Sequence, residues 1–185
     1  MRPRTHKELL HAMQQKMLER TGLRLGKSHL RELLAAACGC NTWAGLTSGY
    51  VLLDIGEPPP ELTTSKITHR CVQLGYDEAQ TSVTSVALAN HLEYEGIFAM
   101  RIRDLVGVIR SVKMPGSLHA EQSQHPGDEH LLDDEEHDET RPEFVDDITH
   151  SELARHGLEE LADKGNPDAT AALRLLKLPS LEVVM

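Results

Sequence analysis

The sequence predicts an all-α fold, and three observations support that prediction. Aromatic residues make up only 3% of the 185 residues, so Leu, Ile, Val, Met and Ala must fill the core, which suits helices better than a β-sandwich. Apolar residues recur at helical spacing in most segments, whereas strand-like alternation is too short to build a sheet. Glycines, prolines and capping residues separate the segments. We expect a small helical N-terminal module, a central helical block and a C-terminal αα-hairpin.

Length and cysteine content narrow the class of protein. The length suits one domain or two small ones. No apolar run approaches the roughly 20 residues that span a bilayer, and residues 1–10 lack the apolar stretch of a signal peptide. The three cysteines are too few for a disulfide framework and fit a reducing compartment. We therefore expect a cytoplasmic protein without membrane contact.

The predicted N-terminal module, residues 1–55, begins with a helix. Thr5 and Glu8 have the spacing of a capping box, and Gly22 suits the end of this helix. A second helix is expected to start with Ser28 as its N-cap. Its apolar residues form one stripe at helical spacing: Leu30, Leu33, Leu34, Ala37 and Cys38.

A helix–Gly–helix arrangement completes this module. Gly39 suits the left-handed residue after the second helix, and Asn41 is expected to cap a short third helix that carries Trp43 and Leu46. The pattern fits a helix-turn-helix, in which the third helix would enter the major groove of DNA. That helix offers no Arg, Lys or Gln to read bases, so we interpret Trp43 as a core residue.

The central block, residues 61–113, follows the run Gly56–Pro60, which cannot continue a helix. Ser65 is expected to cap one helix, which ends at Gly75, and Asp77 to cap the next. The buried face of that next helix is expected to hold Ala79, Val83, Val86, Ala87 and Leu92.

After Gly96, the run Ile97–Met100 can be a short strand or the start of a helix. We favour a strand followed by a helix that extends through Ile109. Residues 114–142 then predict an acidic, His-rich linker, because little in them can form a core. In the C-terminal block, residues 143–180, one helix is expected from Phe144 through Leu161. A turn at Gly165-Asn166-Pro167 leads into a second helix over 169–178.

The net charge of −10 hides a gradient along the chain. Residues 1–50 carry eight basic and three acidic side chains, a net charge of +5, whereas residues 51–112 carry five and eight (−3). Residues 113–142 carry a net charge of −7 and residues 143–185 one of −5. The basic end predicts an anionic partner and the acidic part a basic one. The candidate partner-binding residues are Arg24, Lys27 and Arg31 on the basic end, and Asp133, Asp134, Glu135 and Glu136 as an acidic lure or spacer.

No complete catalytic or cofactor motif is present in the sequence. The run Gly22–Ser28 nearly matches a P-loop but has three rather than four residues between its glycines, and a predicted helix precedes it. Cys38 and Cys40 lack the second ligand pair of a zinc site and are interpreted as buried thiols. The histidines of the acidic linker could bind a metal weakly, but a catalytic metal needs a rigid surrounding shell. We therefore expect no enzyme, no metal site and no cofactor.

Two segments resemble known families. The stretch Gly26–Thr47 resembles the small helical domain called glyoxalase-related in bacterial proteins, at Ser28, Glu32, Leu33, Ala35, Gly39, Trp43 and Leu46. That resemblance implies a compact helical module in a bacterial or mobile-element protein rather than an activity. Residues 158–178 resemble one tetratricopeptide-like repeat, at Ala162, Gly165, Asn166, Asp168, Ala169 and Leu173. A single copy implies a hairpin that docks on the main body or on a partner.

These observations predict a non-enzymatic interaction protein, bacterial or from a mobile element, that binds a protein or ribonucleoprotein partner. Its acidic segment would make it an inhibitor or regulator, by mimicking nucleic acid toward a basic partner. The alternative is a DNA-binding regulator that uses the helix-turn-helix-like N-terminal module, with Arg24, Lys27 and Arg31 on phosphates. A metal-dependent enzyme that uses the histidines is a third and weaker possibility.

Overall fold

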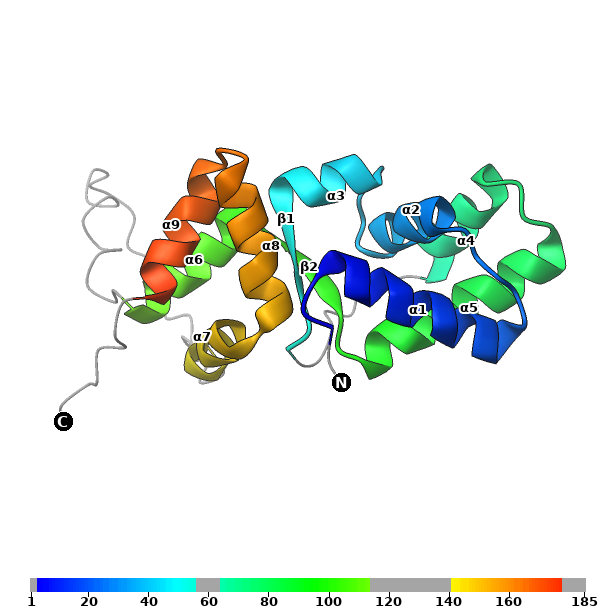
Figure 1. The fold of residues 1–185 in the computed structure, drawn as a ribbon, viewed down its shortest axis with the longest axis horizontal. Coiled ribbons are helices and arrows are strands. Elements are labelled where there is room, and N and C mark those ends of the chain that lie inside the picture. Colours follow the sequence, from blue (N-terminus) through cyan, green and yellow to red (C-terminus); the bar gives the residue numbers. More distant parts are fainter. Residues whose placement is uncertain (1–2, 56–63, 114–140, 178–185) are drawn as a thin grey trace, which may run out of the picture.

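The structure is a computed structural model that describes residues 3–55, 64–113 and 141–177. Its described part is mostly helical, with one two-stranded sheet, which confirms the all-α prediction (Figure 1). In chain order the elements are α1 (His6–Thr21), α2 (Lys27–Ala37), α3 (Trp43–Gly49), β1 (Tyr50–Leu53), α4 (Thr64–Gln73), α5 (Glu78–Tyr94), β2 (Phe98–Arg101), α6 (Ile102–Lys113), α7 (Arg141–His150), α8 (Glu152–Asp163) and α9 (Pro167–Leu176).

Two hydrophobic cores lie on opposite sides of the small sheet. The first core is built mainly from α1, α2, α4 and α5, and the second from α6, α7, α8 and α9. Along β1, Leu52 belongs to the first core, whereas its neighbours Val51 and Leu53 belong to the second. This follows from strand geometry, because successive side chains of a strand point to opposite faces. The sheet is therefore the wall that the two cores share.

The two strands pair antiparallel, with Tyr50 opposite Arg101 and Leu53 opposite Phe98. The strand-then-helix prediction for the segment after Gly96 is confirmed by β2 and α6. Strand β1 was not predicted from the sequence. A strand buried on both faces shows no polar–apolar alternation, so its short apolar run gave no periodic signal.

Three of the predicted helix caps in the N-terminal module, those at Thr5, Gly22 and Gly39, are confirmed and two are wrong. Thr5 caps α1 by accepting a hydrogen bond from the Glu8 amide, and Gly22 (φ 70°) ends that helix in the left-handed region. Helix α2, however, begins after Gly26, so Ser28 lies inside it. The N-cap of α3 is Thr42, whose Oγ1 accepts from the Gly45 amide at 3.0 Å, rather than Asn41.

The early start of α2 has a local cause in the loop that precedes it. The Gln14 Nε2 of α1 donates to the Leu25 carbonyl at 2.5 Å, and the Leu25 side chain is buried in the first core. The chain is thus held in place at Leu25, two residues before α2 begins at Lys27. In the central block, Ser65 also lies inside its helix, because α4 already includes Thr64, so its predicted N-cap role is wrong.

Helix α5 has the predicted cap and a different buried face. Asp77 and Gln80 form a reciprocal capping box, as the sequence indicated for Asp77. Of the predicted buried face, Leu92 is confirmed, whereas Ala79, Val83 and Val86 are exposed. The core-facing side chains are Thr81, Thr84, Ser85, Leu88, Ala89, His91 and Leu92. The two leucines anchor the helix in the first core, and residues one and two turns before them are carried inward on the same face.

The C-terminal block contains three helices, where two were predicted. Helices α7 and α8 are separate because Ser151 leaves the helical conformation and caps α8, accepting from the Ala154 amide at 3.0 Å. The predicted αα-hairpin is confirmed by α8 and α9, which turn at Gly165 (φ 84°) and the N-cap Asn166. The last predicted helical residue, Leu178, lies outside the described residues.

The two hydrophobic cores do not coincide with the predicted blocks, because the central block contributes helices to both cores. Helices α4 and α5 of the central block pack on α2 and α1, whereas α6 of the same block packs on α7 and α9. The predicted boundary at residues 56–60 lies outside the described residues, and so does the acidic linker up to residue 140. Helix α7 begins at Arg141, two residues before the predicted C-terminal block.

Candidate anion-binding surface

An open hollow of about 420 Å³ lies where the end of α2, helix α4, both strands and the start of α6 meet. We call it the first hollow. Its apolar floor includes Ala37, Phe98 and Met100, and its charged lining consists of Lys66, Arg101 and Asp104. A second hollow of about 300 Å³ adjoins it and is lined by Ala36, Gly39, Cys40, Asn41, Ser65, Lys66, His69 and Arg70. Gly39 and Lys66 belong to both hollows.

Lys66 is the cation that the two hollows share. It is exposed on the first turns of α4, and its ammonium group lies against Gly39 at the end of α2. A Cβ on Gly39 would lie 3.3 Å from Lys66 Nζ, so the lack of a side chain there leaves room for the ammonium. No ion pair of Lys66 exists within the described residues. Among these residues, its positive charge is left without a paired carboxylate.

Arg101 holds the other side of the first hollow. Its Nε donates to Tyr50 Oη at 3.1 Å across the strand pair, and its guanidinium lies 5.9 Å from the centre of the Tyr50 ring. The hydrogen bond to Tyr50 and the nearby Asp104 carboxylate raise the pKa of Arg101 above its ordinary value. The guanidinium is therefore charged and held in place, with donors left for a ligand.

Arg70 brings a third cation to the second hollow. Its Nη1 lies 3.1 Å from Glu32 Oε2, and its Nη2 donates to the Asn41 carbonyl at 2.6 Å. Its Nε is buried and has no hydrogen-bond partner in the part of the chain that the structure describes. A buried donor without an acceptor costs free energy, but burial also keeps this atom away from a ligand in the hollow, so Arg70 contributes through its charge.

The thiols beside the hollows are poor nucleophiles. Burial raises the pKa of Cys38 to about 12, and Cys40 adds to that shift. Burial also raises the pKa of Cys40, although Tyr50, Arg101 and Lys66 oppose the shift. Both thiols are consequently protonated at neutral pH, whereas nucleophilic attack and metal binding both require thiolate. The hollows are suited to binding an anion rather than to covalent chemistry.

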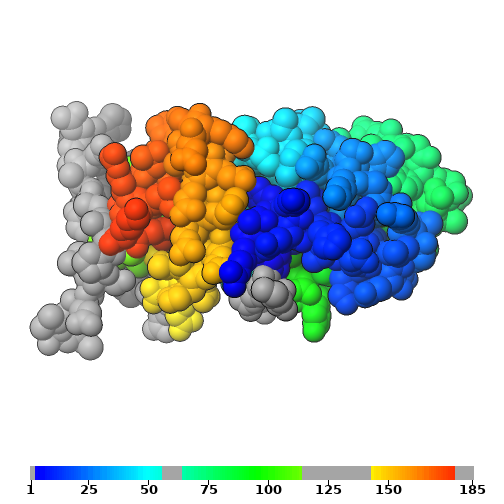
Figure 2. All heavy atoms as spheres, in the orientation of Figure 1, coloured from blue at the N-terminus to red at the C-terminus, as the bar shows by residue number. Residues whose placement is uncertain are grey.

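The cations predicted from the sequence lie elsewhere. Arg24, Lys27 and Arg31 are all exposed, and none of them lines either hollow. Lys27 and Arg31 are one turn apart on α2 and so share a face. Arg31 also lies 5.8 Å from the centre of the Trp43 ring, a cation–π contact. Helices α1 and α2 lie side by side on the surface shown in Figure 2.

The helix-turn-helix interpretation finds little base-reading chemistry on α3. The exposed residues of this helix are Ala44, Gly45 and Ser48. Trp43 is half-buried and contacts the ring of His6 edge-on at 5.9 Å, which agrees with its predicted role in packing. If α2 contacted DNA phosphates, α3 would therefore offer no side chain that distinguishes one base sequence from another.

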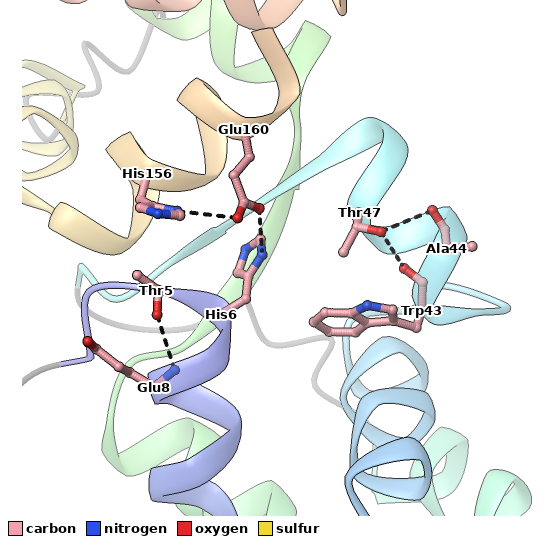
Figure 3. Close-up of polar contacts among 8 residues, drawn as sticks. All are labelled: Thr5, His6, Glu8, Trp43, Ala44, Thr47, His156 and Glu160. Carbon is pink, nitrogen blue, oxygen red and sulfur yellow. Dashed lines mark hydrogen bonds and ion pairs between the residues drawn. The ribbon is translucent and has the colours of Figure 1, made fainter. Parts of the chain in front are cut away.

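Figure 3 shows a polar cluster that joins the two halves of the molecule. Glu160 on α8 lies between two histidines, 3.5 Å from His6 Nδ1 and 3.7 Å from His156 Nδ1. His6 is mostly buried between α8 and Trp43 of α3, and burial lowers its pKa, while Glu160 partly opposes that shift. The cluster therefore connects α1, α3 and α8.

Sequence reasoning missed Lys66, Arg70 and Arg101 because they come from α4 and β2, far apart in a segment of net negative charge. The one local signal was Gly39, which was predicted to be left-handed and has φ 77°. The predicted acidic residues Asp133, Asp134, Glu135 and Glu136 lie outside the described residues.

Three further findings concern the described part and the whole chain. Every described helix is too short or too polar to cross a lipid bilayer. In the same residues, no three His, Cys, Asp or Glu side chains are grouped so that they could hold a metal ion. Comparison of the chain with protein-family models, with curated proteins and with solved structures finds no match.

Proposed function

We propose that this chain is a non-enzymatic interaction protein that binds an acidic segment of a protein or ribonucleoprotein partner in the two hollows around Lys66. The observation that carries the proposal is the ammonium of Lys66, which lines both hollows and has no ion pair within the described residues. Arg101 and Arg70 add a positive charge on either side of it. Against these three cations stand two carboxylates, Asp104 in the lining and Glu32, which forms an ion pair with Arg70. The charge balance favours an anionic ligand.

The form of the hollows favours a chain of anionic groups over a single ion. The two hollows are open and adjacent, with volumes of about 420 and 300 Å³. Successive carboxylates of an extended peptide could contact Arg101, Lys66 and Arg70 in turn, and an apolar side chain could pack on the half-buried Met100. Among the described residues, the aromatic rings that line the first hollow are Tyr50, which Arg101 already contacts, and the buried Phe98, so base stacking gains little. We therefore favour an acidic protein segment as the ligand.

The experiment measures the binding of a fluorescein-labelled oligoglutamate peptide to the full chain by fluorescence anisotropy. We expect saturable binding that Lys66→Glu combined with Arg101→Glu weakens by about tenfold or more, or about 1.4 kcal/mol. The matched control, Lys16→Glu combined with Arg110→Glu, makes the same change in net charge at exposed positions outside the hollows. Equal weakening by both double variants contradicts the proposal, because it shows that net charge alone attracts the peptide.

The acidic segment would regulate this site by competing for it. If Asp133, Asp134, Glu135 and Glu136 act as a lure, their replacement by Asn and Gln should tighten the binding of oligoglutamate. A variant in which these four residues are neutralised and Lys66 is changed to Gln should lose that gain. If the neutralised variant binds oligoglutamate with unchanged affinity, the four acidic residues do not compete for the site and serve only as a spacer.

Duplex DNA is the second candidate ligand. Lys27 and Arg31 share an exposed face of α2, where they could contact phosphates. The small side chains exposed on α3 predict binding without sequence preference. The test is a salt titration of duplex binding by the full chain, with Lys27→Glu and Arg31→Glu. A steep salt dependence that these variants reduce supports this candidate, and no binding at low salt eliminates it.

A further inference from the structure

Helix α5 exposes apolar side chains and buries polar ones. Val83 and Val86 are 46% and 50% exposed, whereas Thr84 is completely buried. The Oγ1 of Thr84 and the Nδ1 of His91 are buried without a hydrogen-bond partner in the described part of the chain. A helix that faces water on one side normally exposes polar side chains and buries apolar ones. At Val83, Val86 and Thr84, helix α5 shows the opposite arrangement.

The exposed residues of α5 form a stripe along the helix. Ala79, Val83, Val86, Asn90 and Tyr94 follow one another at intervals of three or four residues, and all are exposed. We call these residues the α5 stripe. Tyr94 at its end is 81% exposed. The stripe belongs to neither hollow, so it is a separate surface.

The charged side chains that α5 and its two caps carry are all negative, whereas Lys16 and Arg20 of the neighbouring α1 lie close enough to His91 to act on its charge. Helix α5 contains no Lys or Arg. The exposed carboxylates of Asp77 and Glu78 lie at its start, and those of Glu93 and Glu95 lie at its end. An apolar centre with acidic ends complements an apolar centre with basic ends.

We propose that the α5 stripe docks an amphipathic helix of a partner protein, with an apolar face flanked by Lys and Arg. Val83 and Val86 would pack against that apolar face, and the carboxylates at both ends of α5 would meet the basic flanks. A second copy of this chain fits the stripe less well. Two α5 helices, in either relative direction, would bring acidic ends against acidic ends. This inference does not depend on the anion-binding hollows.

The probe is a labelled amphipathic helical peptide made of leucine and lysine, titrated into the full chain. We expect saturable binding, at least about tenfold weaker in the variant Val83→Asp with Val86→Asp, or about 1.4 kcal/mol. These substitutions keep the attraction for lysine and remove the apolar contact, so a loss reports on packing. The matched control is Val72→Asp on α4, which is 62% exposed and lies outside the stripe, and we expect a change below about twofold. A peptide of leucine and glutamate should not bind.

Three outcomes would overturn the proposal. Equal weakening by Val72→Asp and by the α5 variant would show that the contact is not confined to the stripe. Loss of binding when Asp133, Asp134, Glu135 and Glu136 are neutralised, with the α5 variant unaffected, would assign the peptide to the acidic segment. A concentration-dependent dimer in sedimentation, abolished by Val83→Asp with Val86→Asp, would make a second copy the occupant. Circular dichroism of each variant verifies that the helices are intact.

Discussion

The ammonium of Lys66 lies against Gly39, so closely that a Cβ on Gly39 would be 3.3 Å from Lys66 Nζ. Gly39 ends α2 in the left-handed region (φ 77°), and Lys66 belongs to α4. The end of α2 and the side chain of Lys66 on α4 are therefore close together, and both Gly39 and Lys66 line the two hollows. A side chain at Gly39 would therefore change both the backbone conformation there and the position of the Lys66 ammonium.

Gly39→Ala should destabilise the protein by about 1–2 kcal/mol, because an L-residue with a side chain is strained in the left-handed region. The added methyl group should also displace the Lys66 ammonium. The matched control is Gly107→Ala in α6, where a Cβ meets no other atom within 4 Å and φ is not positive. That change should stabilise the helix by up to about 1 kcal/mol. Denaturant unfolding measures both, and a similar gain in both variants would contradict the strain at Gly39.

Ser151→Ala should be among the most costly single-atom deletions. Ser151 Oγ donates to the buried Asp54 Oδ1 at 2.5 Å and also caps α8. Loss of a cap costs about 1 kcal/mol. A buried carboxylate left without its donor adds about 1–3 kcal/mol. The free energy of unfolding should therefore fall well beyond the cost of the cap alone, and Asp54→Asn, which keeps an acceptor, should cost less. A loss of only the cap's size would show that water replaces the Ser151 hydroxyl.

The positions of most helices were predictable from local signals in the sequence. Which side of each helix is buried was harder to predict. The caps Thr5 and Asp77 were predictable because a cap is formed by residues three positions apart. The strand β1 and the buried face of α5 depend on partners far along the chain. For α5, the apolar residues are spread around the helix, so only its packing against the first core decided that Leu88 and Leu92 point inward.

The candidate site was missed for a related reason. Charge was counted along the chain, and residues 51–112 carry a net charge of −3. Lys66, Arg70 and Arg101 all lie in that segment, and folding brings them to two adjacent hollows. The net charge of a segment does not tell where its cations gather in space, whereas Arg24, Lys27 and Arg31 are close in sequence and line neither hollow.

Thr84→Val should stabilise the protein by about 1 kcal/mol, because it replaces a buried hydroxyl that has no partner within the described residues by a methyl group of similar size. Thr81, also buried on α5, is the matched control. Its Oγ1 donates to the Tyr76 carbonyl at 3.5 Å, so Thr81→Val should bring no gain. Thermal and denaturant unfolding compare the two variants. Equal gains would mean that methyl burial alone, and not the unpaired oxygen, decides the effect.

Stability should fall as the pH is lowered from about 7.5 to about 5.5. Burial lowers the pKa of both His6 and His91 below the ordinary value of 6.5, while Glu160 and Glu95, respectively, partly oppose the shift. The unfolded chain therefore takes up these protons at a higher pH than the folded chain. Stability is lost as the pH falls through 6.5 toward the folded pKa values, and below them the loss is complete.

The measurement is the free energy of unfolding across that pH range. The variant His6→Gln with His91→Gln should show a weaker dependence on pH, whatever its stability at neutral pH. The exposed His11 gives the control His11→Gln, which should leave the dependence as in the wild type. An unchanged slope in the double variant would place the titration in other groups.

The most direct test of the anion-binding hollows is to map the site by NMR on the isotope-labelled full chain during a titration with oligoglutamate. The account predicts saturable shifts centred on the amides of Gly39, Cys40, Lys66, Arg70 and Arg101, strongly reduced in Lys66→Gln. Shifts centred instead on Lys27 and Arg31, or shifts that Lys66→Gln leaves intact, would contradict it.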